Sequence, residues 1–315
     1  MSQLLDLGKN IQLIDVMDLR LPKRTGSYIL PEQEVTIIET SASPSIPYLL
    51  KGLEQLHINP EQVAYIIVTH IHLDHAGGVG LLLEKCPNAK VIVHPRGKRH
   101  LADPTKLIQG AKAVYGDTFG TLFDPIIPVP EERLLEKADG ETLKIGENRT
   151  LTFYDTPGHA KHHFSIHDSY SNGIFTGDTI GVLYPQIKAI EFVLPSTSPN
   201  QFDPEAMLAS LERIEQMNVD HIYFGHFGKS DHPSAVYQQI KDWLPKFVAV
   251  GEQVIKENEQ ATANELTVAV TEGLLESIRE FLEKQGVHAN DDVYQYIKLD
   301  ANICAQGIID YLMKK

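Results

Sequence analysis

The first hundred residues alternate between continuous apolar runs and stretches whose apolar side chains follow helical spacing. Residues 43–58 predict a helix that begins at Ser43-Pro44, and residues 79–85 predict a second helix. Strands that alternate with helices favour an α/β layered sheet. Five short runs predict the strands: 11-IQLIDV-16, 27-SYILP-31, 35-VTIIET-40, 64-AYIIVTH-70 and 90-KVIVH-94.

A second β-rich half follows the proline-rich stretch 125-PIIPVP-130. A helix over residues 203–217 interrupts this half, with Asp203 as its N-cap and a proline at its first position. The expected strands cover residues 142–145, 150–156, 164–168, 173–178 and 221–226.

Beyond Pro233 the pattern becomes helical, with segments expected at about 234–258, 263–285 and 290–313. We therefore divide the chain into a catalytic domain of residues 1–232 and a helical C-terminal appendage of residues 233–315. The apolar positions of the appendage suggest either a cover for a pocket or a homodimer surface.

Charge and composition limit the classes of partner. The formal net charge is −14, which disfavours nucleic acid and anionic membrane and leaves a small molecule as the expected partner. The chain has no continuous apolar run of membrane-spanning length, and its first residues do not resemble a signal peptide. Two widely separated cysteines fit a reducing compartment, so a cytoplasmic location is expected.

The strand-like run at 64–70 leads into a cluster of ionisable side chains, 70-HIHLDH-75. In an extended strand His70 and His72 point to one face, and Asp74 and His75 follow in a loop that opens a helix. Imidazole nitrogens and carboxylate oxygens are the usual protein ligands of zinc, and iron and manganese also accept them. The cluster therefore predicts one part of a metal site.

Three other predicted strands end in, or lead to, a histidine or an aspartate next to a glycine. These residues are His159, Asp178 and His226. Ligands are often gathered where the ends of several strands meet at one edge of an α/β sheet. We expect the three side chains to join the first cluster there.

This order of residues, HxHxDH followed by H, D and H, resembles the signature of the metallo-β-lactamase superfamily over about residues 10–232. The resemblance implies a four-layer αβ/βα sandwich of two mixed sheets, with two metals at one edge. It implies the following ligands: His70, His72 and His159 for the first metal, Asp74, His75 and His226 for the second, and Asp178 as a bridge.

The activity implied by the resemblance is that of a di-metal hydrolase. A hydroxide that bridges two divalent ions would attack a small ester, thioester, lactone or phosphodiester. Asp74 is expected to act also as the orienter or proton acceptor of that hydroxide. Zinc is the first expectation for the metals, and iron or manganese could take its place.

Four further side chains are candidates for contacts with the ligands or the substrate. His94 ends a predicted strand beside the expected site, and His162 and His163 follow His159 closely. Tyr184 lies shortly after Asp178. Acyl-homoserine lactonases of the superfamily use a tyrosine in a similar place.

The resemblance leaves a second reaction class open, an iron-binding member with oxygen or persulfide chemistry. Flavodiiron oxygen reductases usually carry glutamate where this chain has His72, which favours hydrolysis. Persulfide dioxygenases keep HxHxDH and use iron at the first site, so the motif alone does not separate the two classes.

Overall fold

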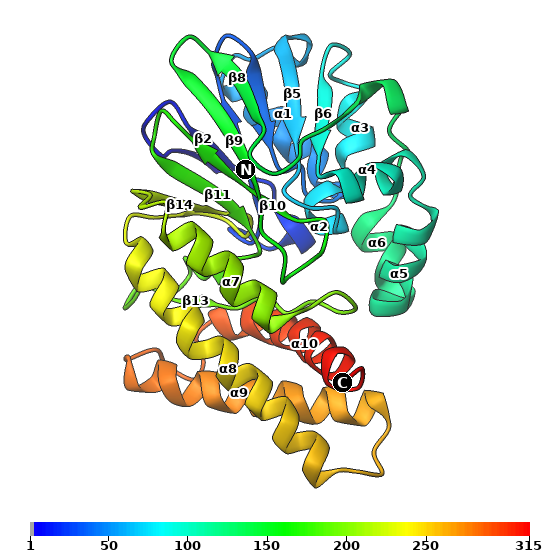
Figure 1. The fold of residues 1–315 in the computed structure, drawn as a ribbon, viewed down its shortest axis with the longest axis vertical. Helices are drawn as coiled ribbons and strands as arrows, with labels where there is room; N and C mark the ends of the chain where they lie inside the picture. The colour runs from blue at the N-terminus through cyan, green and yellow to red at the C-terminus, as the bar shows by residue number, and fades with distance from the viewer. Residues whose placement is uncertain (1–2) are drawn as a thin grey trace. The chain divides into compact units, whose positions relative to one another are not determined.

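The computed structural model describes residues 3–315 (Figure 1). The chain forms two compact units. The first contains Met1–Asp155, His162–Gly177 and Val219–Asp231, and the second contains Thr156–Lys161, Asp178–Asn218 and His232–Lys315. The second unit thus includes more of the chain than the predicted C-terminal appendage, and the domain boundary at residues 232 and 233 stays a prediction.

The first unit contains a seven-stranded mixed sheet in the order β1-β2-β3-β4-β5-β6-β7. Strands β1 to β4 pair antiparallel, and β4 to β7 pair parallel. The strands are β1 Leu4–Asp6, β2 Gln12–Asp15, β3 Gly26–Leu30, β4 Val35–Ile38, β5 Val63–Ile67, β6 Lys90–Val93 and β7 Leu134–Glu136. The parallel pairs require crossover connections, which contain α1 Ile46–Gln55, α2 Leu73–Ala76, α3 Val79–Leu83, α4 Pro95–Ala102, α5 Thr105–Tyr115 and α6 Phe119–Phe123.

A second sheet of the same unit has the order β15-β14-β11-β10-β9-β8. Its strands are β8 Thr142–Gly146, β9 Arg149–Asp155, β10 Phe164–Asp168, β11 Gly173–Gly177, β14 His221–Phe224 and β15 Lys229–Ser230. Only β11 and β14 pair parallel. A short turn over residues 169–172 joins β10 to β11, which pair antiparallel with Asp168 opposite Gly173.

The strands of the first sheet send alternate residues into two different cores, as the period of two requires. On one face Ile67 lies in a cluster with Phe153 of the second sheet. On the other face Ile66 lies in a cluster with Leu49 of α1 and Leu82 of α3. The unit therefore contains helices, sheet and sheet in successive layers, and the predicted α/β sandwich class is confirmed.

The second unit is mainly helical. It contains α7 Pro204–Glu215, α8 Pro233–Glu257, α9 Ala263–Lys284 and α10 Val293–Leu312, with a small ladder of β12 Val182–Leu183 and β13 Val193–Leu194. The N-cap of α7 is Asp203, whose side chain accepts a hydrogen bond from the backbone N–H of Ala206, as predicted. The three C-terminal helices are also confirmed, to within a few residues at each end.

Apolar side chains of α9 are used inside the second unit. Leu274, Ile278 and Leu282 are fully buried, and Phe281 stacks on Phe192 at 5.5 Å between ring centroids. The homodimer hypothesis was based on these apolar positions. Because they are used inside the second unit, they do not support a dimer surface, and the homodimer stays a prediction. Among the described residues, the helices are too short or too polar to cross a membrane.

Two details of the strand and helix prediction were wrong. Strand β5 ends at Ile67, so His70 and His72 lie in a loop and not in an extended strand. The segment predicted to begin a helix at Ser43 first forms a 3-10 turn, Ser43–Ser45, before α1. Ser43 is the first residue of this turn and not its N-cap, and its hydroxyl contacts the backbone carbonyls of Gly77 and Pro125. Both cysteines are buried, and burial raises the pKa of each to about 12.

Candidate metal centre

The loop that carries 70-HIHLDH-75 is held by the residues that follow β4. The backbone N–H and the hydroxyl of Thr40 both donate to the carbonyl of His75, each at 3.0 Å. Glu39 Oε1 accepts a hydrogen bond from the N–H of Thr69 at 3.1 Å. Glu39 and Ser41 adopt positive φ angles of 67° and 59°, a strained conformation for these residue types. Strain of this kind persists only where the surroundings impose it, here beside the ligand loop.

Asp74, His75 and His226 form a compact group inside the first unit. Asp74 Oδ2 lies 3.7 Å from His75 Nε2 and 3.6 Å from His226 Nε2. These distances are too long for hydrogen bonds. Ligand bonds of about 2.0–2.1 Å at tetrahedral angles place ligand atoms about 3.3 Å apart, so the spacing suits three atoms around one ion.

His159 and Asp178 make a similar pair in the second unit. His159 Nε2 lies 3.6 Å from Asp178 Oδ2, and both side chains are almost fully buried. The same carboxylate oxygen accepts a hydrogen bond from the hydroxyl of Ser196 at 3.0 Å. Ser198 Oγ lies 3.4 Å from His159 Nε2. A short loop, residues 196–198, therefore touches both members of the pair.

The second ring nitrogen of each of four buried histidines has a polar neighbour. His159 Nδ1 lies 2.9 Å from the carbonyl of Ser196, and this oxygen can only accept a hydrogen bond. The proton of His159 is therefore on Nδ1, and Nε2 is able to bind a cation. His70 Nδ1 and Thr69 Oγ1 are 3.0 Å apart, and His75 Nδ1 and Glu39 Oε2 are 3.4 Å apart. The fourth histidine is His226, whose Nδ1 lies 3.3 Å from Oγ1 of Thr25.

His226 belongs to a chain of buried polar groups. Thr25 Oγ1 donates to Asp18 Oδ2 at 3.1 Å and lies 3.3 Å from His226 Nδ1. Because the single hydroxyl proton points to Asp18, the hydroxyl oxygen accepts the N–H of His226, which again leaves Nε2 for a cation. Burial raises the pKa of Asp18 above its ordinary value, and the guanidinium of Arg24 opposes this effect.

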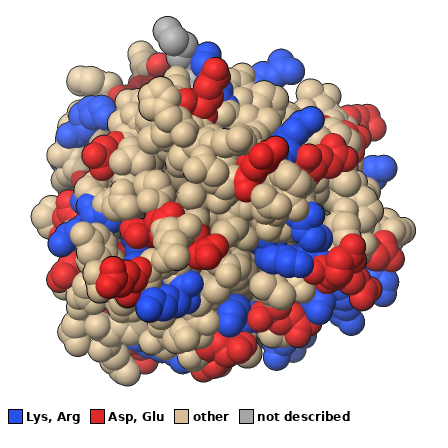
Figure 2. Space-filling model, turned by 90° about the horizontal axis from the view of Figure 1, so that it is seen from above, with Lys and Arg blue, Asp and Glu red and all other residues tan. Residues whose placement is uncertain are grey.

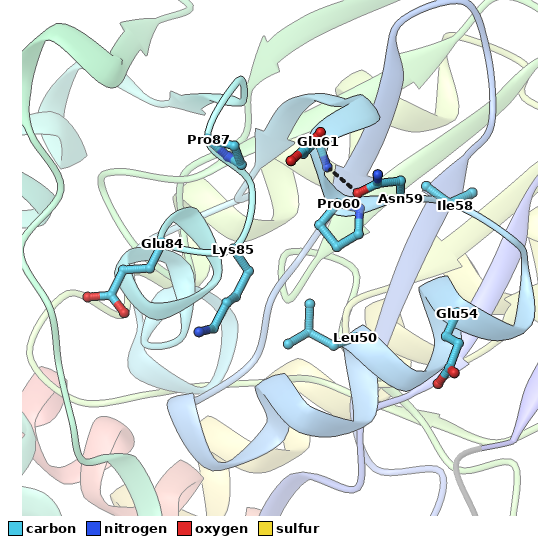
Figure 3. Close-up of a pocket in the computed structure, with 9 residues that line it drawn as sticks. All are labelled: Leu50, Glu54, Ile58, Asn59, Pro60, Glu61, Glu84, Lys85 and Pro87. Atoms are coloured by element: carbon cyan, nitrogen blue, oxygen red, sulfur yellow. Dashed lines mark hydrogen bonds between the residues drawn. The ribbon is translucent and has the colours of Figure 1, made fainter.

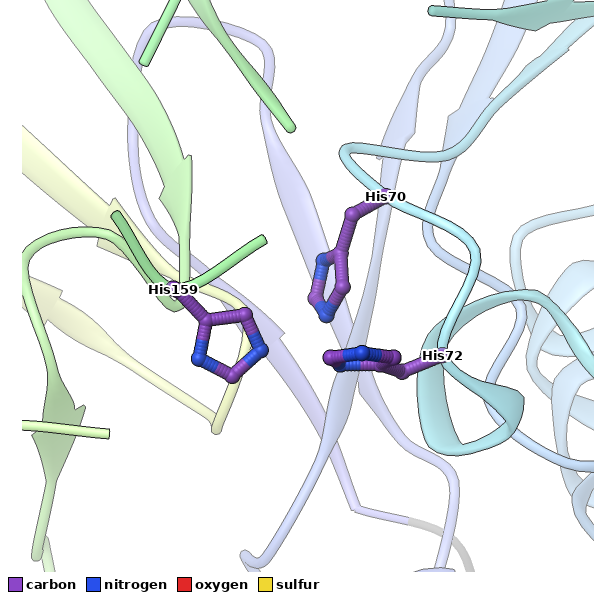
Figure 4. Close-up of side chains that lie close together, drawn as sticks. All are labelled: His70, His72 and His159. Carbon is purple, nitrogen blue, oxygen red and sulfur yellow. The ribbon is translucent and has the colours of Figure 1, made fainter. Parts of the chain in front are cut away.

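Three sets of side chains place their ligand atoms within 4.8 Å of one another. They are His70 with His72 and His159, His70 with His75 and Asp178, and Asp74 with His75 and His226. Figure 4 shows the rings of the first set pointing toward one another. The first and third sets have the same members as the two sets expected from the sequence, and Asp178 is grouped with one residue of each. The donor atoms fit divalent zinc, iron or manganese.

The glycine before His226 is required by a close approach. A Cβ atom on Gly225 would lie 2.8 Å from Cε1 of His75. Tyr28 fixes the same turn, because its buried hydroxyl contacts the carbonyls of Phe224 and Gly228 at 2.6 and 2.7 Å. The position of His226 therefore depends on the packing of β3 against this turn.

The remaining candidates differ in their surroundings. The rings of His162 and His163 stack on His70, with centroids 6.3 and 5.0 Å away. His94 instead contacts Asp155, with Nε2 3.1 Å from Oδ1, and accepts the N–H of Arg96. Burial lowers the pKa of His94, and Asp155 opposes this effect.

Tyr184 is buried in the second unit, and its hydroxyl donates to Asp300 Oδ2 of α10 at 2.8 Å. The supporting residues Thr25, Glu39 and Ser196 were not predicted. A single hydroxyl or carboxyl in a loop gives no pattern that separates it from solvent-facing residues of the same type.

Two hollows on the surface of the first unit are lined by residues that are not proposed metal ligands. One, of about 610 Å³, lies over the end of α1 and the end of α3 (Figure 3). It is lined by Leu50, Glu54, Ile58, Asn59, Pro60, Glu61, Glu84, Lys85 and Pro87, none of which is a predicted ligand. On the face drawn in Figure 2, acidic and basic side chains are interspersed with neutral surface.

Comparisons with known proteins give a consistent family. Residues 24–226 match the family model described as metallo-beta-lactamase superfamily. The chain is 29% identical over 189 residues to the metallo-beta-lactamase fold-containing protein ST1585 of Sulfurisphaera tokodaii, which is 59% of this chain and 68% of that protein. It is 27% identical over 131 residues to rubredoxin-oxygen oxidoreductase of Megalodesulfovibrio gigas, which is 42% of this chain and 27% of that protein.

Solved structures show the same fold. The metallo-beta-lactamase family protein TTHA1429 from Thermus thermophilus superposes with a TM-score of 0.67 at 20% identity, over 98% of this chain and 95% of that one. ST1585 from Sulfolobus tokodaii gives a TM-score of 0.62 at 24% identity, over 74% of this chain and 85% of that one.

Proposed function

Because the chain belongs to the metallo-β-lactamase superfamily, we propose that it is a hydrolase that depends on two divalent metal ions. His70, His72 and His159 would bind one ion, and Asp74 and His75, together with His226 and the bridging Asp178, would complete the centre. The observation that supports this most strongly is the 3.6–3.7 Å spacing of Asp74 Oδ2 from two imidazole Nε2 atoms. Hydrogen-bonded atoms would lie closer together than this. Side chains without a shared ligand would have no reason to converge on one point.

The side chains divide the work of the proposed reaction. Bound divalent ions would supply a water of lowered pKa and would polarise the bond that is cleaved. Glu39 Oε2 lies 3.4 Å from Nδ1 of His75 and Thr25 Oγ1 lies 3.3 Å from Nδ1 of His226, so each ring has a polar neighbour on the side away from Nε2. The Asp74 side chain is 23% exposed while that of His75 is 0% exposed. We assign to Asp74 the second role of accepting a proton, because it is the open member of its set.

The proposed substrates are small esters, thioesters, lactones or phosphodiesters, and zinc is the proposed metal. His162 and His163 would orient His70 or contact the substrate, since both rings stack on it. Tyr184 and His94 are weaker candidates for such contacts, because the structure pairs them with Asp300 and Asp155. The partner is proposed to be a small molecule, without nucleic acid or membrane, and the location is proposed to be cytoplasmic.

A second candidate function is iron-dependent redox chemistry. It is favoured by the similarity to rubredoxin-oxygen oxidoreductase, which covers only 27% of that protein. The set of three histidines at the first position favours hydrolysis, because nitrogen-rich sites suit zinc. Metal analysis of protein purified without added metal separates the two functions. Two zinc ions in a colourless protein support the hydrolase, and iron with a visible absorption band supports the redox function.

The proposed ligands are tested by replacing His159 and Asp178 with alanine, with His288→Ala on the exposed surface as the control. Each ligand variant is expected to lose at least one metal ion per chain and its turnover of a panel of esters, lactones and a phosphodiester. His288→Ala is expected to keep both. Full metal content and full activity in either ligand variant would show that the assignment is wrong.

A further inference from the structure

One face of the C-terminal helix α10 follows the chain segment that contains the loop 196–198. The contacting residues of α10 are spaced three or four positions apart, as one face of a helix requires: Asp300, Cys304, Gly307 and Tyr311. Lys314, just beyond the end of the helix, makes a further contact. Their partners are Tyr184, the backbone at 195–198, Phe202 and the carbonyl of Asn200. One face of α10, in the predicted helical appendage, thus packs against the chain segment of residues 184–202.

Two of these residues, Cys304 and Gly307, contact Thr197. Its hydroxyl donates to the carbonyl of Cys304 at 3.0 Å, and its N–H lies 3.4 Å from Cys304 Sγ. A Cβ atom on Gly307 would lie 1.9 Å from the carbonyl oxygen of Thr197. Because that neighbour is a backbone atom, it cannot turn aside as a flexible side chain could. On the other side of Ser196, Cys304 Sγ lies 3.5 Å from the carbonyl oxygen of Pro195. Helix α10 therefore contacts the backbone on both sides of Ser196.

Ser196 in turn touches two proposed metal ligands. Its carbonyl accepts the N–H of His159 Nδ1 at 2.9 Å, and its hydroxyl donates to Asp178 Oδ2 at 3.0 Å. A displacement of Thr197 would move both of these groups together. The polar partners of metal ligands set the orientation of those ligands, and their loss commonly lowers metal affinity about 10- to 100-fold.

We propose that α10 positions the metal centre, with Gly307 and Cys304 holding the Pro195–Ser198 loop so that Ser196 orients His159 and Asp178. This inference rests on the proposed function, because it treats those two residues as ligands. Gly307 and Cys304 are positioning residues and touch no reacting group. The C-terminal helix is then part of the metal site's support and not only a cover or an association surface.

The test is a matched pair of glycine-to-alanine variants in the full-length protein, Gly307→Ala and Gly251→Ala. Gly251 lies on α8, and a Cβ there would meet Cγ2 of Ile308 at 2.3 Å and Cδ1 of Leu312 at 3.0 Å. Both variants therefore disturb the packing of α10, but only Gly307→Ala pushes on Thr197. Zinc affinity is measured by competition with a chromophoric chelator, and the Co²⁺-substituted protein is compared by its visible absorption spectrum.

Gly307→Ala is expected to weaken binding of at least one zinc ion about tenfold or more and to change the Co²⁺ spectrum. Gly251→Ala is expected to lower the melting temperature at unchanged affinity and spectrum. Equal affinity in Gly307→Ala and the wild type, or an equal loss in both variants, would overturn the proposal. If Gly307→Ala does not fold, Thr197→Val decides by the same criterion, since it removes only the hydroxyl bond to Cys304.

Two results distinguish the proposed hydrolase function from the role of α10. A wild-type protein that binds neither zinc nor Co²⁺ would overturn the proposed function and this inference with it. A wild-type protein that binds metal and hydrolyses a substrate, with an unaffected Gly307→Ala variant, would overturn only the role of α10.

Discussion

At Thr25 a single hydroxyl connects the buried carboxylate of Asp18 to the proposed ligand His226. Thr25→Val keeps the shape of the side chain and removes both contacts. We expect about a tenfold loss of affinity at the second metal, because His226 loses the partner that fixes its tautomer. We also expect a loss of about 1–3 kcal/mol in stability, since Asp18 keeps its burial and loses a donor. Chelator competition and urea unfolding measure the two effects.

Thr25→Ser is the matched control, because it retains the hydroxyl and should keep near wild-type metal affinity. Thr36→Val gives a second control, since this buried hydroxyl bonds only the carbonyl of Glu34, two residues away in sequence. Unchanged metal affinity in Thr25→Val would mean that His226 is oriented by the turn at Gly225 alone.

Residue type explains what the sequence could predict of the site. Histidine and aspartate at strand ends stand out, because few structural roles need them there. Thr25 could not be found in the same way, since its partner His226 is 201 positions away and threonine is common in every kind of loop. Ser196 lies in a stretch of serines, threonines and prolines, 195-PSTSP-199, where several residues could serve equally well.

At the scale of elements, the hydrophobic pattern predicted most strands and helices because the central strands, such as β5, bury their two faces in separate cores. The same pattern could not locate the end of β5. Val68 continues the apolar run and is fully buried, but the strand ends one residue earlier. Burial in a loop and burial in a strand leave the same apolar signature, so His70 and His72 were placed in an extended segment.

Arg149, the first residue of β9, is paired with Asp168, the last residue of the neighbouring strand β10. Its side chain is 1% exposed and pairs with Asp168 through two bonds of 2.9 and 2.6 Å, and with Glu32 at 3.0 Å. Arg149→Met would leave the fully buried Asp168 without its counter-charge. We expect a loss of about 3–5 kcal/mol in the free energy of unfolding, measured by urea denaturation.

Asp168→Asn added to Arg149→Met tests whether that loss comes from the unpaired charge. The double variant is expected to recover part of the stability, because the carboxylate no longer has to be buried as an ion. Arg149→Lys should stay well below the wild type, since an ammonium group cannot form the two parallel bonds. If Arg149→Met costs under about 1 kcal/mol, the pair does not anchor β9 to β10.

At the scale of the whole molecule, the proposed ligands come from positions between His70 and His226, so only the folded chain can present them together. Metal that binds the folded state alone stabilises it by RT ln(1 + [L]/Kd), which is about 4 kcal/mol at a thousandfold excess over Kd. Removal of metal with a chelator is therefore expected to lower the melting temperature by several degrees.

The effect should be reversible and should need the ligands. Zinc added back in slight excess is expected to restore the melting temperature of the wild type. His159→Ala and Asp178→Ala, which already lack part of the metal, should melt near the chelated wild type and respond less to the chelator. A wild type that releases two metal ions without any change in melting would show that the ions are held by groups also available in the unfolded chain. Ligands drawn together from separate strand ends cannot behave in that way.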